Sequence, residues 1–116
     1  MTDNPAASLE QRQHMLKSLL SIRLAEQQIQ ELFLQNLVRG TTHLCIGQEA
    51  CSVGVASAMQ PGDTLTCTYR GHGYALAMGM TLDALMAEMM GKASGACGGK
   101  GGSMHISDAN VGMLGA

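Results

Sequence analysis

Aromatic residues and net charge are both scarce in this sequence, and their scarcity argues against a nucleic-acid partner. The 116 residues include no tryptophan, one phenylalanine and two tyrosines, and the formal net charge is -2. Proteins that bind nucleic acids neutralise phosphates with a basic surface, and single strands are bound by stacking on aromatic rings. Apolar residues make up 46% of the chain and charged residues 14%, a balance typical of a globular chain. The composition therefore predicts one folded domain with no nucleic-acid partner.

Signals for export, membrane insertion and zinc binding are missing as well. The first residues hold no basic segment followed by an apolar run, and no uncharged apolar stretch approaches the ~20 residues of a spanning helix. The four cysteines form no Cys-x-x-Cys pair, which favours free thiols over a zinc site or a disulfide framework. We therefore expect a cytoplasmic protein with no membrane contact and with no metal held by these residues alone.

Apolar periodicity predicts a long first helix. Residues 1–7 are expected to be a loose tail, and Ser8 with Gln11 three positions later forms a capping-box pattern. Apolar residues then recur at three- and four-residue steps, and no glycine or proline interrupts the segment before Gly40. The predicted helix runs from Ser8 to Arg39, with Gly40 as its stop.

The rest of the chain predicts short helices around a single strand. The expected elements are a helix over 48–59, a turn over 61–63, a strand over 64–69, a turn over 71–73, a short helix over 74–78 and a helix over 81–90. Because a parallel sheet needs several strands, each returning through a crossover, one strand is an incomplete supply. The predicted fold class is α/β, mostly helical with the start of a parallel sheet.

A glycine-rich segment follows at residues 91–102, which contain six glycines. Such a segment suits neither a helix interior nor a central strand, so we predict a loop whose backbone closely approaches another group. Its Gly99-Lys100 pair lacks both the earlier glycine and the following serine or threonine of a Walker phosphate loop. The final residues, 111–116, are apolar and carry no stop signal, so we expect the natural chain to continue.

The strongest candidate for a binding site comes directly after the predicted strand, where Tyr69, Arg70 and His72 stand among glycines. Ligands of parallel sheets bind at the carboxyl ends of the strands. The planar guanidinium of Arg70 suits phosphate oxygens, Tyr69 adds a hydroxyl, and His43 and His72 carry imidazoles, a type of side chain that can transfer protons. Taken alone, such an arginine is more often solvated or ion-paired and such a histidine more often structural. Both interpretations stay open on these residues.

Four segments taken together resemble a known enzyme family. In chain order they are Gly47-Gln48-Glu49-Ala50, Tyr69-Arg70-Gly71-His72-Gly73, Glu88-Met89-Met90-Gly91-Lys92 and Gly99-Lys100-Gly101-Gly102-Ser103-Met104-His105. Their order and spacing resemble the alpha subunit of thiamine-diphosphate-dependent dehydrogenases, the first enzymes of the pyruvate, branched-chain 2-oxo acid and acetoin dehydrogenase complexes. The resemblance covers nearly the whole chain. Residues 1–116 would then be the N-terminal part of the thiamine-diphosphate-binding domain.

The resemblance implies roles for individual residues. Tyr69 and Arg70 match the pair that contacts the diphosphate, and His43 matches a histidine that faces the substrate end of the cofactor. His72 would be a second active-site histidine, and the Ser103 loop would shape the pocket wall. In this family a 2-oxo acid such as pyruvate loses carbon dioxide and the acyl group passes to a lipoyl carrier, with the carbanion chemistry supplied by the cofactor.

Partners and missing parts are implied in the same way. The partners would be a beta subunit, a second alpha subunit and a lipoyl-bearing acyltransferase, usually in a heterotetramer. The ligands of the magnesium ion on the diphosphate are expected beyond residue 116, and the activating glutamate lies on the beta subunit. Arg70 and Tyr69 alone supply only a few kcal/mol of charge-assisted hydrogen bonding. We therefore expect the chain by itself to be inactive and to bind thiamine diphosphate no tighter than millimolar.

Three alternatives accompany this interpretation. Within the enzyme class, an acetoin dehydrogenase alpha subunit would carry the same motifs. A non-catalytic truncated fragment that assembles with other subunits is a second alternative, and a small helical binding module unrelated to thiamine is a third. Assays with the partner subunits separate the first two, because co-purification with a beta subunit but no turnover would support the fragment.

Overall fold

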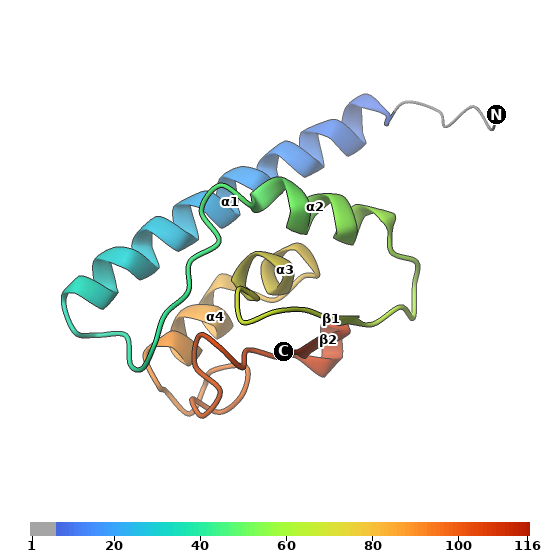
Figure 1. The fold of residues 1–116 in the computed structure, drawn as a ribbon. Helices are drawn as coiled ribbons and strands as arrows, with labels where there is room; N and C mark the ends of the chain where they lie inside the picture. The colour runs from blue at the N-terminus through green and yellow to red at the C-terminus, as the bar shows by residue number, and fades with distance from the viewer. Residues whose placement is uncertain (1–6) are drawn as a thin grey trace.

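The computed structural model describes residues 7–116 and shows short elements gathered beneath one long helix (Figure 1). In chain order the elements are α1 (Leu9–Leu34), α2 (Glu49–Ala58), β1 (Leu65–Thr66), α3 (His72–Ala77), α4 (Leu82–Met89), the 3-10 turn η1 (Ala109–Val111) and β2 (Met113–Gly115). β1 and β2 form a two-stranded parallel sheet. The chain is mostly helical with a short parallel sheet, which confirms the predicted α/β class. The predicted tail lies, except for its last residue, outside the described residues.

α1 begins as predicted. The Ser8 hydroxyl oxygen accepts the Gln11 N–H at 3.1 Å, and the Gln11 side-chain oxygen accepts the Ser8 N–H at 2.7 Å. This reciprocal pair is a capping box, which satisfies two backbone donors that a helix start would otherwise leave free. The interpretation of Ser8 as the helix cap is confirmed.

The predicted end of α1 is wrong, because the helix stops at Leu34 and does not reach Arg39. Asn36 adopts a left-handed backbone with a φ of 58°. The N–H groups of Asn36 and Leu37 both donate back to carbonyls of the last helical turn, at 2.9 Å. Glycine is the usual residue at such an ending, but asparagine tolerates the left-handed region as well. The prediction took Gly40 as the stop and overlooked Asn36.

Two clusters of buried apolar side chains hold the helices together, one larger and one smaller. The larger cluster contains Ile29, Val38, Ala75, Met80, Leu85, Met89, Ile106 and Met113. The smaller cluster, between α1 and α2, contains Ile22, Cys45 and Val53. α1 lies across α2 and α3 (Figure 1), and its other side exposes a row of leucines at 9, 16, 20 and 24. None of the helices in residues 7–116 is long and apolar enough to cross a bilayer.

β1 is shorter than the predicted strand over 64–69, and it has a partner that the sequence did not reveal. β2 pairs with it in parallel, with Leu65 opposite Met113. The Leu65 N–H donates to the Gly112 carbonyl at 2.8 Å, and the Cys67 N–H donates to the Gly115 carbonyl at 3.0 Å. β2 ends at Gly115, which is opposite Thr66, and residues 68 and 69 pair with no residue of β2. The apolar segment 111–116 thus contains the second strand of the sheet.

α3 starts at His72, whereas the prediction placed a turn over 71–73 and the helix over 74–78. The prediction took both glycines of this segment as turn residues, but Gly73 is helical. An ideal Cβ on Gly73 would lie 2.6 Å from the Ser52 hydroxyl oxygen and 2.9 Å from the Cys45 sulfur. Close packing against α2 therefore requires this glycine, and His72 falls on a helix turn that faces the core.

α4 confirms its predicted cap and end. The Thr81 hydroxyl oxygen accepts the Ala84 N–H at 3.2 Å, and Gly91 follows the helix with a left-handed φ of 65°. The segment 91–102 is a loop, as predicted, and it folds back over the end of α4. Its backbone N–H groups converge on the side chain of Glu88.

Candidate functional site

Three of the predicted site residues meet in one place. Tyr69 and Arg70 lie in the turn between β1 and α3, and His43 lies in the connector between α1 and α2. The ring centroids of His43 and Tyr69 are 4.4 Å apart and the rings are tilted by 58°. The Arg70 guanidinium carbon is 5.9 Å from the centroid of the Tyr69 ring, within the range of a cation–π contact. The fold thus gathers an imidazole, a phenol and a guanidinium from two separate segments.

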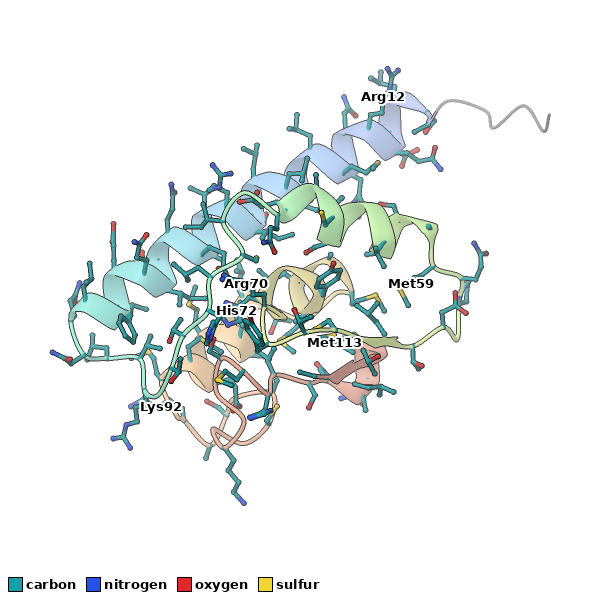
Figure 2. The ribbon with its side chains drawn as sticks, viewed as in Figure 1. Arg12, Met59, Arg70, His72, Lys92 and Met113 are labelled. Carbon is teal, nitrogen blue, oxygen red and sulfur yellow. The ribbon has the colours of Figure 1, made fainter. Side chains whose placement is uncertain are left out.

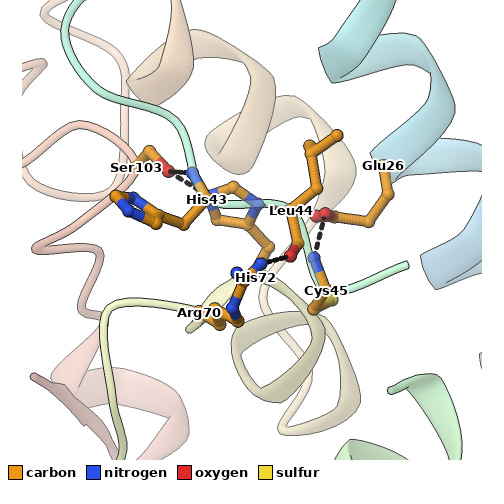
Figure 3. Close-up of polar contacts among 7 residues, drawn as sticks. All are labelled: Glu26, His43, Leu44, Cys45, Arg70, His72 and Ser103. Atoms are coloured by element: carbon orange, nitrogen blue, oxygen red, sulfur yellow. Dashed lines mark hydrogen bonds and ion pairs between the residues drawn. The ribbon is translucent and has the colours of Figure 1, made fainter. Parts of the chain in front are cut away.

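Arg70 carries a charge that the described residues leave without a counter-ion. One guanidinium nitrogen donates a hydrogen bond to the Leu44 carbonyl oxygen, as Figure 3 shows. The ion pairs within residues 7–116 are Arg23–Glu49 and His72–Glu26, and neither includes Arg70. A guanidinium offers five N–H donors in a planar fork that matches phosphate oxygens. The donors of Arg70 that remain therefore fit the oxygens of a diphosphate.

His43 contributes a polar atom that has no partner among the described residues. Its Nδ1 is buried and forms no hydrogen bond, and the hydroxyl oxygen of Thr42 is in the same state. Buried polar atoms almost always have a partner, so each exception calls for an explanation. A ligand or a further protein segment against the His43 ring would supply the missing partner. This observation agrees with the substrate-facing role that the resemblance implies for His43.

His72 is buried, whereas Tyr69 is exposed and Arg70 and His43 are half-buried. Figure 2 labels His72 and Arg70 near the centre of the chain. The His72 side chain is completely buried, with Nδ1 2.6 Å from a Glu26 carboxylate oxygen and Nε2 2.8 Å from the Ser103 hydroxyl oxygen. Both ring nitrogens are therefore engaged inside the protein. The structure does not bring this ring to the surface shared by Tyr69 and Arg70. A direct catalytic role for His72 stays a prediction, and this geometry does not favour it.

Two residues hold these histidines and their backbone through contacts that the sequence did not predict. Glu26 comes from the buried face of α1, and Ser103 comes from the end of the glycine-rich loop. The Ser103 hydroxyl oxygen accepts the His43 N–H at 3.2 Å, and the second carboxylate oxygen of Glu26 accepts the Cys45 N–H at 2.7 Å. A signal for Glu26 was present in the sequence, because an acidic residue interrupts an otherwise apolar stripe there.

The electrostatics of the connector between α1 and α2 favour a fixed backbone over a reactive thiol. A hydrogen bond from Arg23 at 2.6 Å is the largest factor that lowers the pKa of Glu49, to about 2. The Glu49 carboxylate also accepts the Gly47 N–H at 3.0 Å and so anchors the end of the connector. Burial, followed by the charge of Glu26, raises the pKa of Cys45 to about 12. The Cys45 thiol therefore stays protonated, which excludes it as a nucleophile at neutral pH.

Tyr69 is exposed and Arg70 and His43 are half-buried, so these three residues form an open wall that solvent reaches from one side. A groove of about 660 Å³ lies between the first half of α1 and α2, lined in part by His14, Met15 and Ser57. None of Tyr69, Arg70 or His43 contributes to it. Within residues 7–116, no group of three histidine, cysteine or acidic side chains is placed to hold a metal ion. The magnesium ligands expected beyond residue 116 stay a prediction.

Comparison with known proteins places the chain in a family. Residues 17–116 match the family described as "Dehydrogenase E1 component". The alpha subunit of the acetoin:2,6-dichlorophenolindophenol oxidoreductase of Bacillus subtilis is 51% identical over 88% of this chain. The corresponding subunit of Cupriavidus necator is 41% identical over 86%, and the testis-specific pyruvate dehydrogenase E1 alpha subunit of Homo sapiens is 38% identical over 86%. The chain spans 27–31% of the length of these relatives. It belongs to the dehydrogenase E1 component family, and its relatives there are alpha subunits.

Proposed function

We propose that this chain forms one wall of a thiamine diphosphate site in an E1 alpha subunit. The proposal rests on the state of Arg70: its guanidinium has unused donors and no carboxylate partner among the described residues. Tyr69 places a phenol beside that charge. A diphosphate is the ligand whose charge and oxygen geometry best complement this pair.

Each of the three side chains has its own task in this proposal. Thiamine diphosphate, when bound, supplies the carbanion chemistry that breaks a bond next to a carbonyl group. Arg70 and Tyr69 hold the diphosphate and keep the cofactor in register with the protein. His43 faces the substrate, where its unpartnered Nδ1 donates a hydrogen bond to a substrate oxygen or accepts one from a substrate hydroxyl. His72 supports this arrangement from the interior.

The substrate we propose is acetoin, with pyruvate or another 2-oxo acid as the second candidate. The motifs of the sequence favoured a 2-oxo acid, and the identity to relatives named for acetoin is the reason that we place acetoin first. Two relatives named for acetoin are 51% and 41% identical to this chain, and relatives named for pyruvate dehydrogenase are 37–40% identical. In the 2-oxo acid reaction the acyl group would pass to a lipoyl carrier.

The open wall supports a proposal about partners. A cofactor gripped from one side by Arg70 and Tyr69 stays exposed to water, which weakens each charge-assisted contact. We therefore expect a beta subunit and further alpha-subunit chain to close the site, with magnesium ligands outside residues 1–116. We further propose that the chain assembles with a second alpha subunit and with a lipoyl-bearing acyltransferase. The proposed location is the cytoplasm.

Calorimetric titration of thiamine diphosphate tests the cofactor assignment. In the assembled enzyme that contains this chain, Arg70→Met should weaken binding about 10- to 100-fold, the effect of losing hydrogen bonds to a charged group. Arg12→Met is the matched control, because Arg12 is exposed on α1, and it should leave the affinity unchanged. Equal affinities for Arg70→Met and the wild type would refute the assignment.

Two further arms separate the remaining candidates. The chain alone should bind thiamine diphosphate no tighter than millimolar, so micromolar binding to it would contradict the one-wall proposal. Turnover of acetoin should exceed turnover of pyruvate and of branched-chain 2-oxo acids in the assembled enzyme. If the chain co-purifies with a beta subunit and none of these substrates reacts, the non-catalytic assembly fragment is the better description.

A further inference from the structure

A continuous chain of polar contacts runs through the interior beneath His43. It links Glu26 on α1 to His72 on α3, and His72 to Ser103 at the end of the glycine-rich loop (Figure 3). The distances are 2.6 Å and 2.8 Å. Glu26 and His72 have no exposed surface, and Ser103 is 2% exposed. Three segments distant in sequence therefore meet through side chains that solvent does not reach.

Both ends of this chain terminate on the backbone of one short connector, residues 43–45. Ser103 accepts the His43 N–H at 3.2 Å, and Glu26 accepts the Cys45 N–H at 2.7 Å. Between them, the Leu44 carbonyl oxygen accepts a hydrogen bond from Arg70. Three successive backbone groups are thus held by three side chains from different elements.

The connector needs such contacts because it has no regular structure of its own. Residues 41–45 belong to no helix or strand, so no helical turn or strand pairing satisfies the N–H groups of His43 and Cys45. A hydrocarbon core of equal volume would stabilise the fold as well as a buried polar chain does, but it would not fix the direction of individual N–H groups. The contacts therefore specify a backbone geometry.

The hydrogen-bond directions are consistent along the whole series of contacts from Glu26 through His72 to Ser103. With the Glu26 carboxylate ionised, His72 donates through Nδ1 and accepts the Ser103 hydroxyl hydrogen at Nε2. Ser103 is then free to accept the His43 N–H, and Glu26 to accept the Cys45 N–H. Every donor has one acceptor, so no buried polar atom of His72, Ser103 or Glu26 is left over.

A serine, a histidine and a carboxylate in this order resemble an acyl-transfer triad, but the burial excludes that role. A nucleophilic hydroxyl must reach a substrate carbonyl. The Ser103 hydroxyl is buried, and its oxygen already accepts a backbone N–H. The Glu26–His72–Ser103 contacts can therefore act only through His43, whose backbone N–H they hold.

We propose that the Glu26–His72–Ser103 chain is a positioning device that fixes residues 43–45 and thereby aims the His43 ring. The ring lies against Tyr69, and its Nδ1 has no partner inside the described residues. A shift of the connector would move that nitrogen away from a substrate held beside Arg70. The effect on catalysis rests on the proposed function. The hold on the backbone of residues 43–45, which we call the clamp, is a property of the fold and does not depend on that function.

Ser103→Ala in the assembled enzyme tests the device, because it removes the acceptor of the His43 N–H and the donor to His72 together. We expect kcat to fall about 10- to 100-fold, the usual cost of losing a supporting contact behind a reacting group. The dissociation constant of thiamine diphosphate should change less than about threefold, since Arg70 and Tyr69 remain. Hydrogen exchange at the His43 amide should become about tenfold faster.

Ser52→Ala is the matched control. Ser52 is also buried, at 1% exposed, but its hydroxyl oxygen has no hydrogen-bond partner. This variant should keep the wild-type kcat and the wild-type exchange at residues 43–45. Ser103→Thr, which restores a hydroxyl, should recover most of the lost kcat, and recovery of this kind would not follow from a purely steric role.

Glu26→Gln tests the other end of the chain and guards against a folding defect in a single variant. It should raise exchange at the Cys45 amide and lower kcat in the same direction as Ser103→Ala. A wild-type kcat for Ser103→Ala, an equal loss in Ser52→Ala, or unchanged exchange at residues 43–45 would overturn the proposal. If the wild-type assembly binds no thiamine diphosphate and turns over no substrate, the proposed function fails, and the exchange results alone decide the clamp.

Discussion

Two polar regions of this chain differ in whether the chain itself satisfies them. Around Glu88, the carboxylate accepts the N–H groups of four residues of the glycine-rich loop, at 2.8–3.0 Å: Cys97, Gly99, Gly101 and Gly102. Around Arg70, the guanidinium has one carbonyl acceptor and no carboxylate, and the neighbouring His43 Nδ1 has no partner. We call the region around Glu88 the closed region, because its backbone donors are satisfied by the Glu88 carboxylate, and the region around Arg70 and His43 the open region. The open region leaves a cation and a polar atom unused.

The difference separates a scaffold from a site. A loop of backbone N–H groups around an anion is the arrangement that phosphate-binding loops use, but here Glu88 takes the place of the phosphate. The glycine-rich segment was predicted to approach another group closely, and that group belongs to the protein itself. By holding Gly101 and Gly102, Glu88 also fixes the position of the adjacent Ser103. The closed region thus supports the open one.

Glu88→Ala should break the closed region with the largest effect. The substitution leaves four part-buried backbone donors without their acceptor, and we expect a loss of about 3–5 kcal/mol in the free energy of unfolding. Urea denaturation followed by circular dichroism measures it. Glu31→Ala, an exposed acidic residue on α1, is the control and should change stability by less than about 0.5 kcal/mol. Equal stability of the two variants would show that the loop does not depend on its carboxylate.

The sequence was most informative where structure is local. Ser8, Thr81 and Gly91 were recognisable as helix boundaries because a cap acts within one turn of its own residue. Asn36 was missed since asparagine signals a helix end less often than glycine. β2 was missed because a three-residue strand has no periodicity to detect, and its partner lies some fifty residues earlier in the chain.

The candidate site was predictable in part. Tyr69, Arg70 and His43 could be named because the resemblance assigns a role to each motif, and the fold brings all three together. Glu26 could not be connected to His72 from sequence, because the two residues lie on different helices and are 46 positions apart in the chain. The depth of His72 was equally hidden, since burial follows from packing between elements and not from the residues beside it.

Two neighbouring glycines sharpen the description of the closed region. Gly98 and Gly99 both have left-handed φ values, of 65° and 74°. A Cβ on Gly98 would meet open space, whereas one on Gly99 would lie 2.6 Å from the backbone of Gly91 and of Lys92. Gly98→Ala should cost about 1–2 kcal/mol of backbone strain. Gly99→Ala should cost about 1–3 kcal/mol more, because the overlap involves backbone. Thermal unfolding of the pair measures the difference, and equal melting temperatures would contradict the tight packing of this loop.

Acid pH should expose the smallest effect, at the anchor of the connector that carries His43. The hydrogen bond from Arg23 lowers the pKa of Glu49 to about 2, below the ordinary value of 4.5. A carboxylate with a lowered pKa stabilises the fold fully above its unfolded value and loses that contribution as the pH falls through the folded value. The loss should therefore occur between about pH 4.5 and 2, and it should amount to about 1 kcal/mol or less because Arg23 is half-exposed.

Glu49→Gln and Arg23→Met together test whether the Arg23–Glu49 ion pair causes this loss of stability at acid pH. Glu49→Gln removes the titrating group, so the free energy of unfolding should depend less steeply on pH below 4.5. Arg23→Met leaves the carboxylate without its strongest partner, so its contribution should be lost at a higher pH than in the wild type. Glu88 adds to the slope in the same direction: burial alone would raise its pKa, but the backbone N–H groups outweigh burial and lower it. Urea denaturation at several pH values separates the two carboxylates, because Glu49→Gln would leave the part that comes from Glu88. An unchanged slope in Glu49→Gln would mean that this ion pair does not anchor the open region.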